Sequence, residues 1–157
     1  LTAATDVFAG YLLFDALIAN TDRNHENWAV VVPPEGDAWL APSYDHATSL
    51  GFQEPTSRKA QWLAGDALQV GRWVERGRSS HFERKPHLVD LAAGAMQRVP
   101  RAVSRHWRQR LTSLTESAVS ATIDAVPAGL LSQADRTFAF QIVRLNRERL
   151  LRACWAD

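Results

Sequence analysis

The sequence predicts a single, mainly α-helical domain that carries one small β-hairpin near its N-terminus. Most apolar side chains recur at helical spacing, in stretches separated by proline, glycine and short polar runs. One short stretch, residues 28–41, instead combines β-branched residues with a strong turn. A chain of 157 residues fits one domain with a core of its own.

The first predicted helix covers residues 6–19. Its apolar side chains at positions 7, 11, 14 and 18 recur at helical spacing. Thr5 and Asp6 suit a helix start, because a hydroxyl can cap the helix and an acid is favourable in its first turn. Asn20 ends this helix, and the polar run of residues 20–27 follows as a loop.

Residues 28–41 predict the hairpin. Residues 28–32 are rich in valine and too few for a stable helix, so we expect a strand. Residues 33–37 have the composition of a turn, residues 39–41 form the return strand, and Pro42 ends it. From Asp45 to about Lys59 no clear period is present, which predicts mostly loop.

The remaining chain predicts four helices, at residues 60–76, 86–97, 100–126 and 132–153. A polar loop at residues 77–82 separates the first two, and Pro127 breaks the chain before the last. Gly65 and Gly71 weaken the helical pattern of residues 60–76. The large side chains in these helices that we expect in the core are Trp62, Trp73, Trp107 and Phe138.

The composition excludes several classes of protein. Apolar residues make up 46% and charged residues 22% of the chain, as in ordinary globular domains. No apolar run is long enough for a membrane span, and no signal-peptide pattern is present, so a cytoplasmic protein is expected. The lone Cys154 permits no internal disulfide and is expected to be inert. A net charge of +1 indicates no bulk affinity for nucleic acid.

Three oxygen-bearing side chains flank the hairpin and are expected to converge. Asp22 and Asn27 lie five residues apart in the polar run, and the hairpin would return Asp45 to the mouth of that loop. Mg²⁺ prefers a few hard oxygen ligands and keeps several waters, so one Asp and one Asn can hold it beside nucleotide phosphates. A further carboxylate can orient an attacking hydroxyl. The pattern therefore favours phosphotransfer.

The residues around this pattern resemble the HipA-like family of bacterial serine/threonine kinases. In that family an apolar helix leads to a run like N-T-D-R-H-x-x-N, and a metal-binding Asp lies in an A-P-x-Y-D run. A similar D-R-H-x-x-N run occurs in phosphoinositide kinases. The resemblance is specific over residues 12–46 and rests on the strings LIANTDRNHENW at 17–28 and LAPSYD at 40–45.

The resemblance implies a protein-kinase-like C-lobe in which the hairpin carries the catalytic and metal-binding loops. Asp22 would be the catalytic Asp, and Asn27 and Asp45 would bind Mg²⁺ with ATP. Arg23 would hold the loop through Asp45 or a backbone carbonyl. The family has His two residues after the Asp, where it would support the loop or contact a phosphate. This chain has Asn24 there, so either that role passes to His25 or activity is reduced.

The resemblance also implies that residues 1–157 are one domain, a kinase C-lobe with the N-lobe absent. The only lysines, Lys59 and Lys85, do not lie in predicted strands, where a phosphate-binding lysine would be expected. The implied reaction transfers the γ-phosphoryl of ATP to a protein hydroxyl, in a bacterial toxin–antitoxin setting with a DNA-binding antitoxin partner. The alternative is a degenerate or truncated lobe that binds a partner or nucleic acid without catalysis.

Other patterns in the sequence suggest alternative functions with weaker support. An EF-hand in the polar run fails because its sixth position is Asn27 and its twelfth is Pro33. A His-metal hydrolase would use His25, His46 and the two Asp residues, without any paired-ligand motif to support it. The run at 77–81 is either a phosphate or substrate contact or a solvated loop. Binding of nucleic acid or an acidic partner, or simple solvation, remains open for Arg98, Arg101, Arg105, Arg108 and Arg110.

Overall fold

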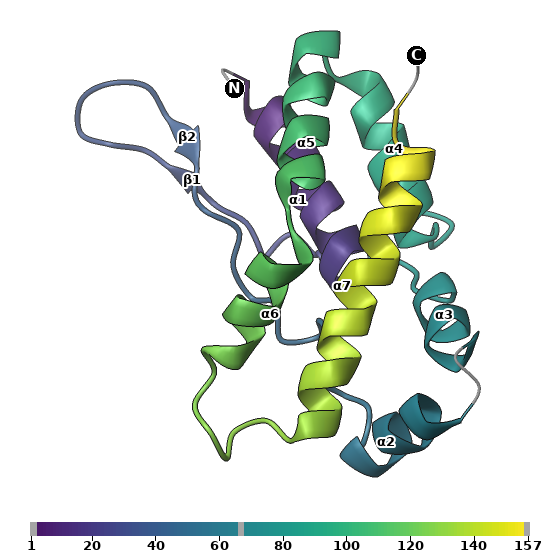
Figure 1. Ribbon diagram of the computed structural model, residues 1–157. Helices are drawn as coiled ribbons and strands as arrows, with labels where there is room; N and C mark the ends of the chain where they lie inside the picture. Colours follow the sequence, from purple (N-terminus) through teal and green to yellow (C-terminus); the bar gives the residue numbers. More distant parts are fainter. Residues whose placement is uncertain (1–2, 66–67, 156–157) are drawn as a thin grey trace.

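The computed structural model describes residues 3–65 and 68–155. Within these residues the chain forms seven helices and one two-stranded antiparallel hairpin (Figure 1). The prediction of a mainly helical domain with a small hairpin is therefore confirmed. In chain order the elements are α1 (Ala4–Ile18), β1 (Val30–Val31), β2 (Trp39–Leu40), α2 (Thr56–Ala64), α3 (Leu68–Glu75), α4 (Leu88–Arg98), α5 (Arg101–Ser113), α6 (Glu116–Asp124) and α7 (Gln133–Ala153).

Helix α7 is the centre of the core. It contacts each of the other six helices, and Figure 1 shows it running the length of the helical body. Its side chains Phe138, Ile142 and Leu150 are completely buried. Ser132 starts the helix: its hydroxyl accepts a hydrogen bond from the Asp135 backbone N–H at 3.1 Å. The predicted helix at 132–153 matches α7 within one residue.

Helix α1 is mostly buried and packs against α4 and α7. It begins at Ala4, two residues before the prediction, and the Asp6 carboxylate accepts a hydrogen bond from the Ala3 backbone N–H at 3.4 Å. At its other end Ala19 adopts a left-handed conformation (φ 56°), and the backbone N–H of Asn20 donates to the Asp15 carbonyl at 2.8 Å. The chain thus leaves the helix abruptly and enters the polar run.

Two predicted helices are each divided in the structure. The helix predicted at 60–76 is α2 and α3. Helix α2 begins at Thr56, inside the predicted loop, and ends at Ala64, just before Gly65. Residues 66–67 lie outside the described residues. The helix predicted at 100–126 is α5 and α6. Thr115 accepts a hydrogen bond from the Ala118 backbone N–H at 3.2 Å, which caps a new helix at that point. Helix α4 begins at Leu88 rather than at residue 86.

The hairpin projects from the side of the helical body (Figure 1). Val30 pairs with Leu40 and Val31 with Trp39, and both strands are shorter than predicted. The strands bury little apolar surface, since Val30 is 50% exposed and Trp39 is 52% exposed, so packing supports only a short ladder. The hairpin is fixed to α1 by a hydrogen bond from the Tyr11 hydroxyl to the Ala41 carbonyl. It returns the chain to the end of α1 that carries the polar run.

Candidate functional site

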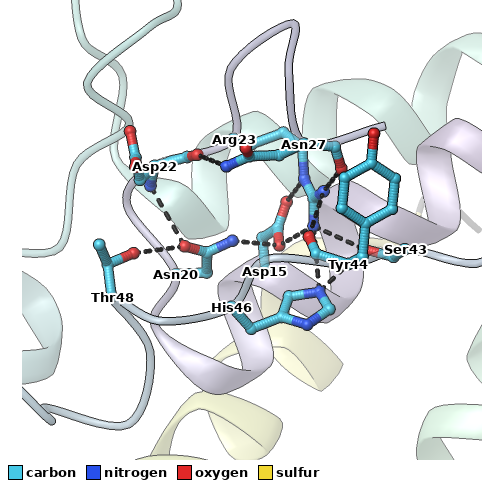
Figure 2. Close-up of polar contacts among 9 residues, drawn as sticks. All are labelled: Asp15, Asn20, Asp22, Arg23, Asn27, Ser43, Tyr44, His46 and Thr48. Atoms are coloured by element: carbon cyan, nitrogen blue, oxygen red, sulfur yellow. Dashed lines mark hydrogen bonds and ion pairs between the residues drawn. The ribbon is translucent and has the colours of Figure 1, made fainter. Parts of the chain in front are cut away.

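A buried ion pair joins the polar run to α1. Asp15 and Arg23 have side chains that are only 3% and 2% exposed. Arg23 Nε donates to Asp15 Oδ2 and Nη2 donates to Asp15 Oδ1, each at 2.7 Å. This two-point geometry fixes the plane of the guanidinium, as is typical of Arg–carboxylate pairs (Figure 2).

The opposite edge of the Arg23 guanidinium holds two further segments. Its Nη1 donates to the backbone carbonyl of Asn27, and the Tyr44 carbonyl lies 3.5 Å away. Its Nη2 donates to Ser43 Oγ at 2.6 Å. Of the two partners predicted for Arg23, the backbone carbonyl is therefore correct. Its carboxylate partner is Asp15, which the sequence reasoning missed, and not Asp45.

Asn20 forms a second buried link. Its Nδ2 donates to Asp15 Oδ1 at 2.8 Å, and its Oδ1 accepts from the Asp22 backbone N–H at 3.2 Å and from Thr48 Oγ1 at 2.6 Å (Figure 2). The side chain is completely buried, and these contacts satisfy it. Asn20 therefore connects the end of α1 to the start of the loop and to the segment after the hairpin.

Asp22 and Asn27 contact one another across the loop. Asn27 Nδ2 donates to the Asp22 backbone carbonyl at 2.6 Å, so the five-residue spacing closes the loop on itself. This bond fixes the amide nitrogen and leaves Oδ1 as the atom with which Asn27 can bind a cation. The Asp22 carboxylate is 40% exposed, so it is accessible to a reactant.

Asp45 lies between two residues that contact Arg23, namely Tyr44 and His46. Its side chain is exposed and its backbone is left-handed, with φ 54°. Non-glycine residues rarely adopt this conformation, although Asp tolerates it better than most. The predicted return of Asp45 towards the polar run is consistent with these neighbouring contacts.

His46 is a neutral acceptor in this network. Ser43 Oγ lies 2.8 Å from His46 Nε2, and Arg23, which can only donate, lies 3.3 Å from the same nitrogen. Burial, and then the positive charge of Arg23, lower the pKa of His46, while the carboxylates of Asp15 and Asp45 oppose the shift. The Nε2 lone pair therefore faces the donors.

Asn24 and His25, the next residues of the polar run, lie outside the Arg23 network. Asn24, which stands where the HipA-like pattern has His, accepts a hydrogen bond from the Glu26 backbone N–H at 2.7 Å and so shapes the loop. His25 is 87% exposed, and its Nε2 lies 4.0 Å from the Glu26 carboxylate. The structure therefore places His25 at the outer edge of the loop, apart from the buried network.

One residue of the site comes from a distant loop. His81 Nε2 donates to Asp22 Oδ1, and the Ser80 backbone N–H donates to the Thr21 carbonyl at 2.9 Å. The sequence indicates that the run at 77–81 is either a phosphate or substrate contact or a solvated loop, but it does not predict the contact with Asp22. A polar run of Arg, Ser and His was the one signal that marked it.

The polar loop and the segment after the hairpin offer oxygen atoms of the kind that Mg²⁺ prefers. Among residues 3–65 and 68–155, no cluster of three or more His, Cys, Asp or Glu side chains suits a metal by itself. Mg²⁺ in kinase sites needs fewer protein ligands, because phosphates and waters supply the rest. Asn27 Oδ1 and the exposed Asp45 carboxylate are hard oxygens of the required kind.

A large pocket beside this site is lined mostly by apolar side chains. Its volume is about 690 Å³, and it is lined by α1, α6, α7 and the segment that follows Asp45. Lys59 and Asp135, which also line it, pair with each other at 2.8 Å. The apolar walls offer little to bind phosphates, so the candidate site is the polar loop.

The arginines between positions 98 and 110 lie on the surface. Arg98 and the arginines of α5 are exposed, as expected of a solvated face, and the Arg108 guanidinium lies 5.9 Å from the centre of the Trp155 ring. None of the helices within the described residues is both long enough and apolar enough to cross a bilayer.

Comparison with known proteins identifies the fold. No family model matches the sequence, and no curated protein matches it. The crystal structure of the Helicobacter pylori proinflammatory kinase CtkA matches 96% of this chain, with a TM-score of 0.72 and 14% sequence identity. The chain spans 52% of the length of that kinase. It therefore has a kinase-like fold, that of a mainly helical lobe with a small hairpin.

Proposed function

We propose that this chain is the base- and metal-bearing lobe of an ATP-dependent kinase that resembles the HipA-like family. The reaction transfers the γ-phosphoryl group of ATP to a protein hydroxyl. The observation that carries the proposal is the Arg23 network, which gathers the Asp22–Asn27 loop and the segment around Asp45 at one end of α1. The kinase-like fold supports it.

Asp22 is the proposed catalytic residue. Its partly exposed carboxylate orients the acceptor hydroxyl and takes its proton as the oxygen attacks phosphorus. The closed loop holds this carboxylate in place, since the Asp22 backbone is bound at its N–H by Asn20 and at its carbonyl by Asn27. Such positioning is most of what a phosphotransfer enzyme supplies.

Asn27 and Asp45 are the proposed Mg²⁺ ligands, through the amide oxygen and the carboxylate. Mg²⁺ bound there supplies neutralisation of charge on the ATP phosphates. Arg23 would position both Mg²⁺ ligands, because it binds the Asn27 carbonyl and contacts the Tyr44 carbonyl, next to Asp45. His25, exposed at the outer edge of the loop, is proposed to reach a phosphate.

The decisive experiment measures phosphoryl transfer from labelled ATP, with Mg²⁺, by the complete gene product that contains these residues. Asp22→Ala is expected to lower kcat by about 10²–10⁴-fold, the usual contribution of a general base. Asp37→Ala is the matched control, since Asp37 is an exposed aspartate in the hairpin turn. Transfer that is insensitive to Asp22→Ala would contradict the assigned role.

The metal assignment has its own test. Asp45→Asn keeps the shape of the side chain and removes its charge, so the Mg²⁺ concentration for half-maximal activity is expected to rise about tenfold or more. The same substitution is expected to weaken Mg²⁺–ATP binding in a calorimetric titration. An unchanged Mg²⁺ dependence would remove Asp45 from the proposed ligands.

The alternative function is a kinase-like module that binds a partner without catalysis. The resemblance implies a DNA-binding partner of antitoxin type, and the exposed arginines of α5 are the face on which an acidic partner would dock. A folded wild-type protein that shows no phosphoryl transfer, but binds such a partner with strong salt dependence, would favour this alternative.

A further inference from the structure

We infer that His81 is a positioning residue for Asp22. Because a carboxylate oxygen only accepts hydrogen bonds, Nε2 of His81 carries the hydrogen and donates it to Asp22 Oδ1. The contact occupies Oδ1 and leaves Oδ2 as the carboxylate oxygen for the acceptor hydroxyl. This inference rests on the proposed kinase function and adds a residue from outside the polar loop to it.

The loop that carries His81 is closed at its neck. Arg78 and His87 form an antiparallel bridge, and the Ser79 backbone N–H donates to the Pro86 carbonyl at 3.0 Å. Arg78 Nη2 also lies 2.7 Å from His87 Nε2. These contacts fix both ends of the loop at residues 78–87, next to α4, and so limit the positions that His81 can take.

The same loop is tied directly to the residue before Asp22. The Ser80 backbone N–H donates to the Thr21 carbonyl at 2.9 Å, immediately beside the contact between His81 and Asp22. Two neighbouring residues of one loop thus bind two neighbouring residues of the other. This pairing holds the imidazole in register with the carboxylate.

The exposure of the pair argues for an orienting role. The side chains of His81 and Asp22 are 43% and 40% exposed, so solvent screens their attraction and the contact adds little to folding stability. The position normally filled by His in the HipA-like pattern is Asn24, whose side chain is occupied by the Glu26 backbone N–H. The imidazole that contacts Asp22 comes from His81, outside the polar run.

The test compares three variants of the complete gene product. His81→Ala removes the donor, and kcat is expected to fall about 10–100-fold, as for loss of a hydrogen bond to a charged group. The KM for ATP is expected to change less than about twofold, because the nucleotide ligands stay in place. His81→Gln keeps a donor and is expected to recover most of kcat. Ser80→Ala, which keeps the backbone bond to Thr21, is the matched control.

A second measurement checks the contact without turnover. NMR signals of the His81 imidazole are expected to shift in Asp22→Asn, whereas those of His106, exposed on α5, are expected not to shift. An unshifted His81 signal would overturn the inference. So would a His81→Ala variant with unchanged kcat, or one with raised kcat, which would mean that His81 blocks the acceptor. A wild-type protein without transfer activity would overturn the proposed function and, with it, the positioning role.

Discussion

Replacing Arg23 by Met tests whether the buried ion pair holds the candidate site together. Met fills much of the same volume but removes the charge and every donor of the guanidinium. Asp15 would then keep a buried, unpaired carboxylate beside Asn20. Loss of one partner from a buried pair is far more costly than loss of both, because the remaining charge is left without compensation.

The magnitude follows from the burial and the geometry of the pair. Side chains that are 2% and 3% exposed, joined by two hydrogen bonds of 2.7 Å, fall in the class for which breaking the pair costs about 3–5 kcal/mol. Donors to Asn27 and Ser43 are lost as well. For a domain with a total stability of about 5–15 kcal/mol, Arg23→Met is a severe change.

Urea unfolding followed by circular dichroism measures this cost. The double variant Asp15→Ala, Arg23→Met is expected to lose at least about 1 kcal/mol less than the sum of the single variants. Arg144→Met is the control, because its pair with Glu148 on α7 is exposed and contributes less than about 1 kcal/mol. A loss below about 1 kcal/mol in Arg23→Met, or strict additivity in the double variant, would refute the reasoning.

Three further predictions concern the helical body. Burial alone would raise the pKa of Asp135, but hydrogen bonds led by Lys59 outweigh it and lower the pKa from 3.8 to about 2. The resulting stabilisation of about 2 kcal/mol is present above pH 4 and lost as pH falls through 2; urea unfolding across this range should show Asp135→Asn converging with wild type in acid. Gly10→Ala should lose about 1–3 kcal/mol in the same assay, despite better helix propensity, because the added Cβ would lie 2.1 Å from the Trp107 ring. Burial raises the pKa of Cys154 to about 12, so iodoacetamide should modify this thiol only after unfolding; rapid native-state labelling would contradict its burial.

The helices were predictable where the apolar pattern is long and regular. The limits of α1 and α7 follow from that pattern within about two residues. The predicted helices at 60–76 and 100–126 were too long, because the apolar periodicity continues across the turn that separates two helices. Gly65 and Thr115 were visible in the sequence, but whether a glycine or threonine ends a helix depends on what the flanking turns pack against.

The site was predictable where its contacts are local. The contact between Asn27 and the Asp22 carbonyl spans five residues, so the loop itself sets it and spacing can reveal it. The contacts of Asp15 and His81 depend on how α1 ends and on where the loop after α3 lies. The sequence does contain one signal for Asp15, because burying an acid among apolar helical residues costs folding free energy unless the carboxylate has a partner.

The burial of the Asp15–Arg23 ion pair explains why this network shapes the site more than it stabilises the fold. Two charges removed from water lose much of their hydration, and their mutual attraction repays this only in part. An apolar pair at Asp15 and Arg23 would fill the space without that cost, but it would make none of the directed bonds to Asn27 and Ser43. What the ion pair adds is direction. A planar donor group of five N–H bonds, held flat against one carboxylate, fixes the loop and the segment after the hairpin at defined angles. For a reaction that depends on the placement of a few oxygen atoms, this fixed geometry is the property that the buried charges supply.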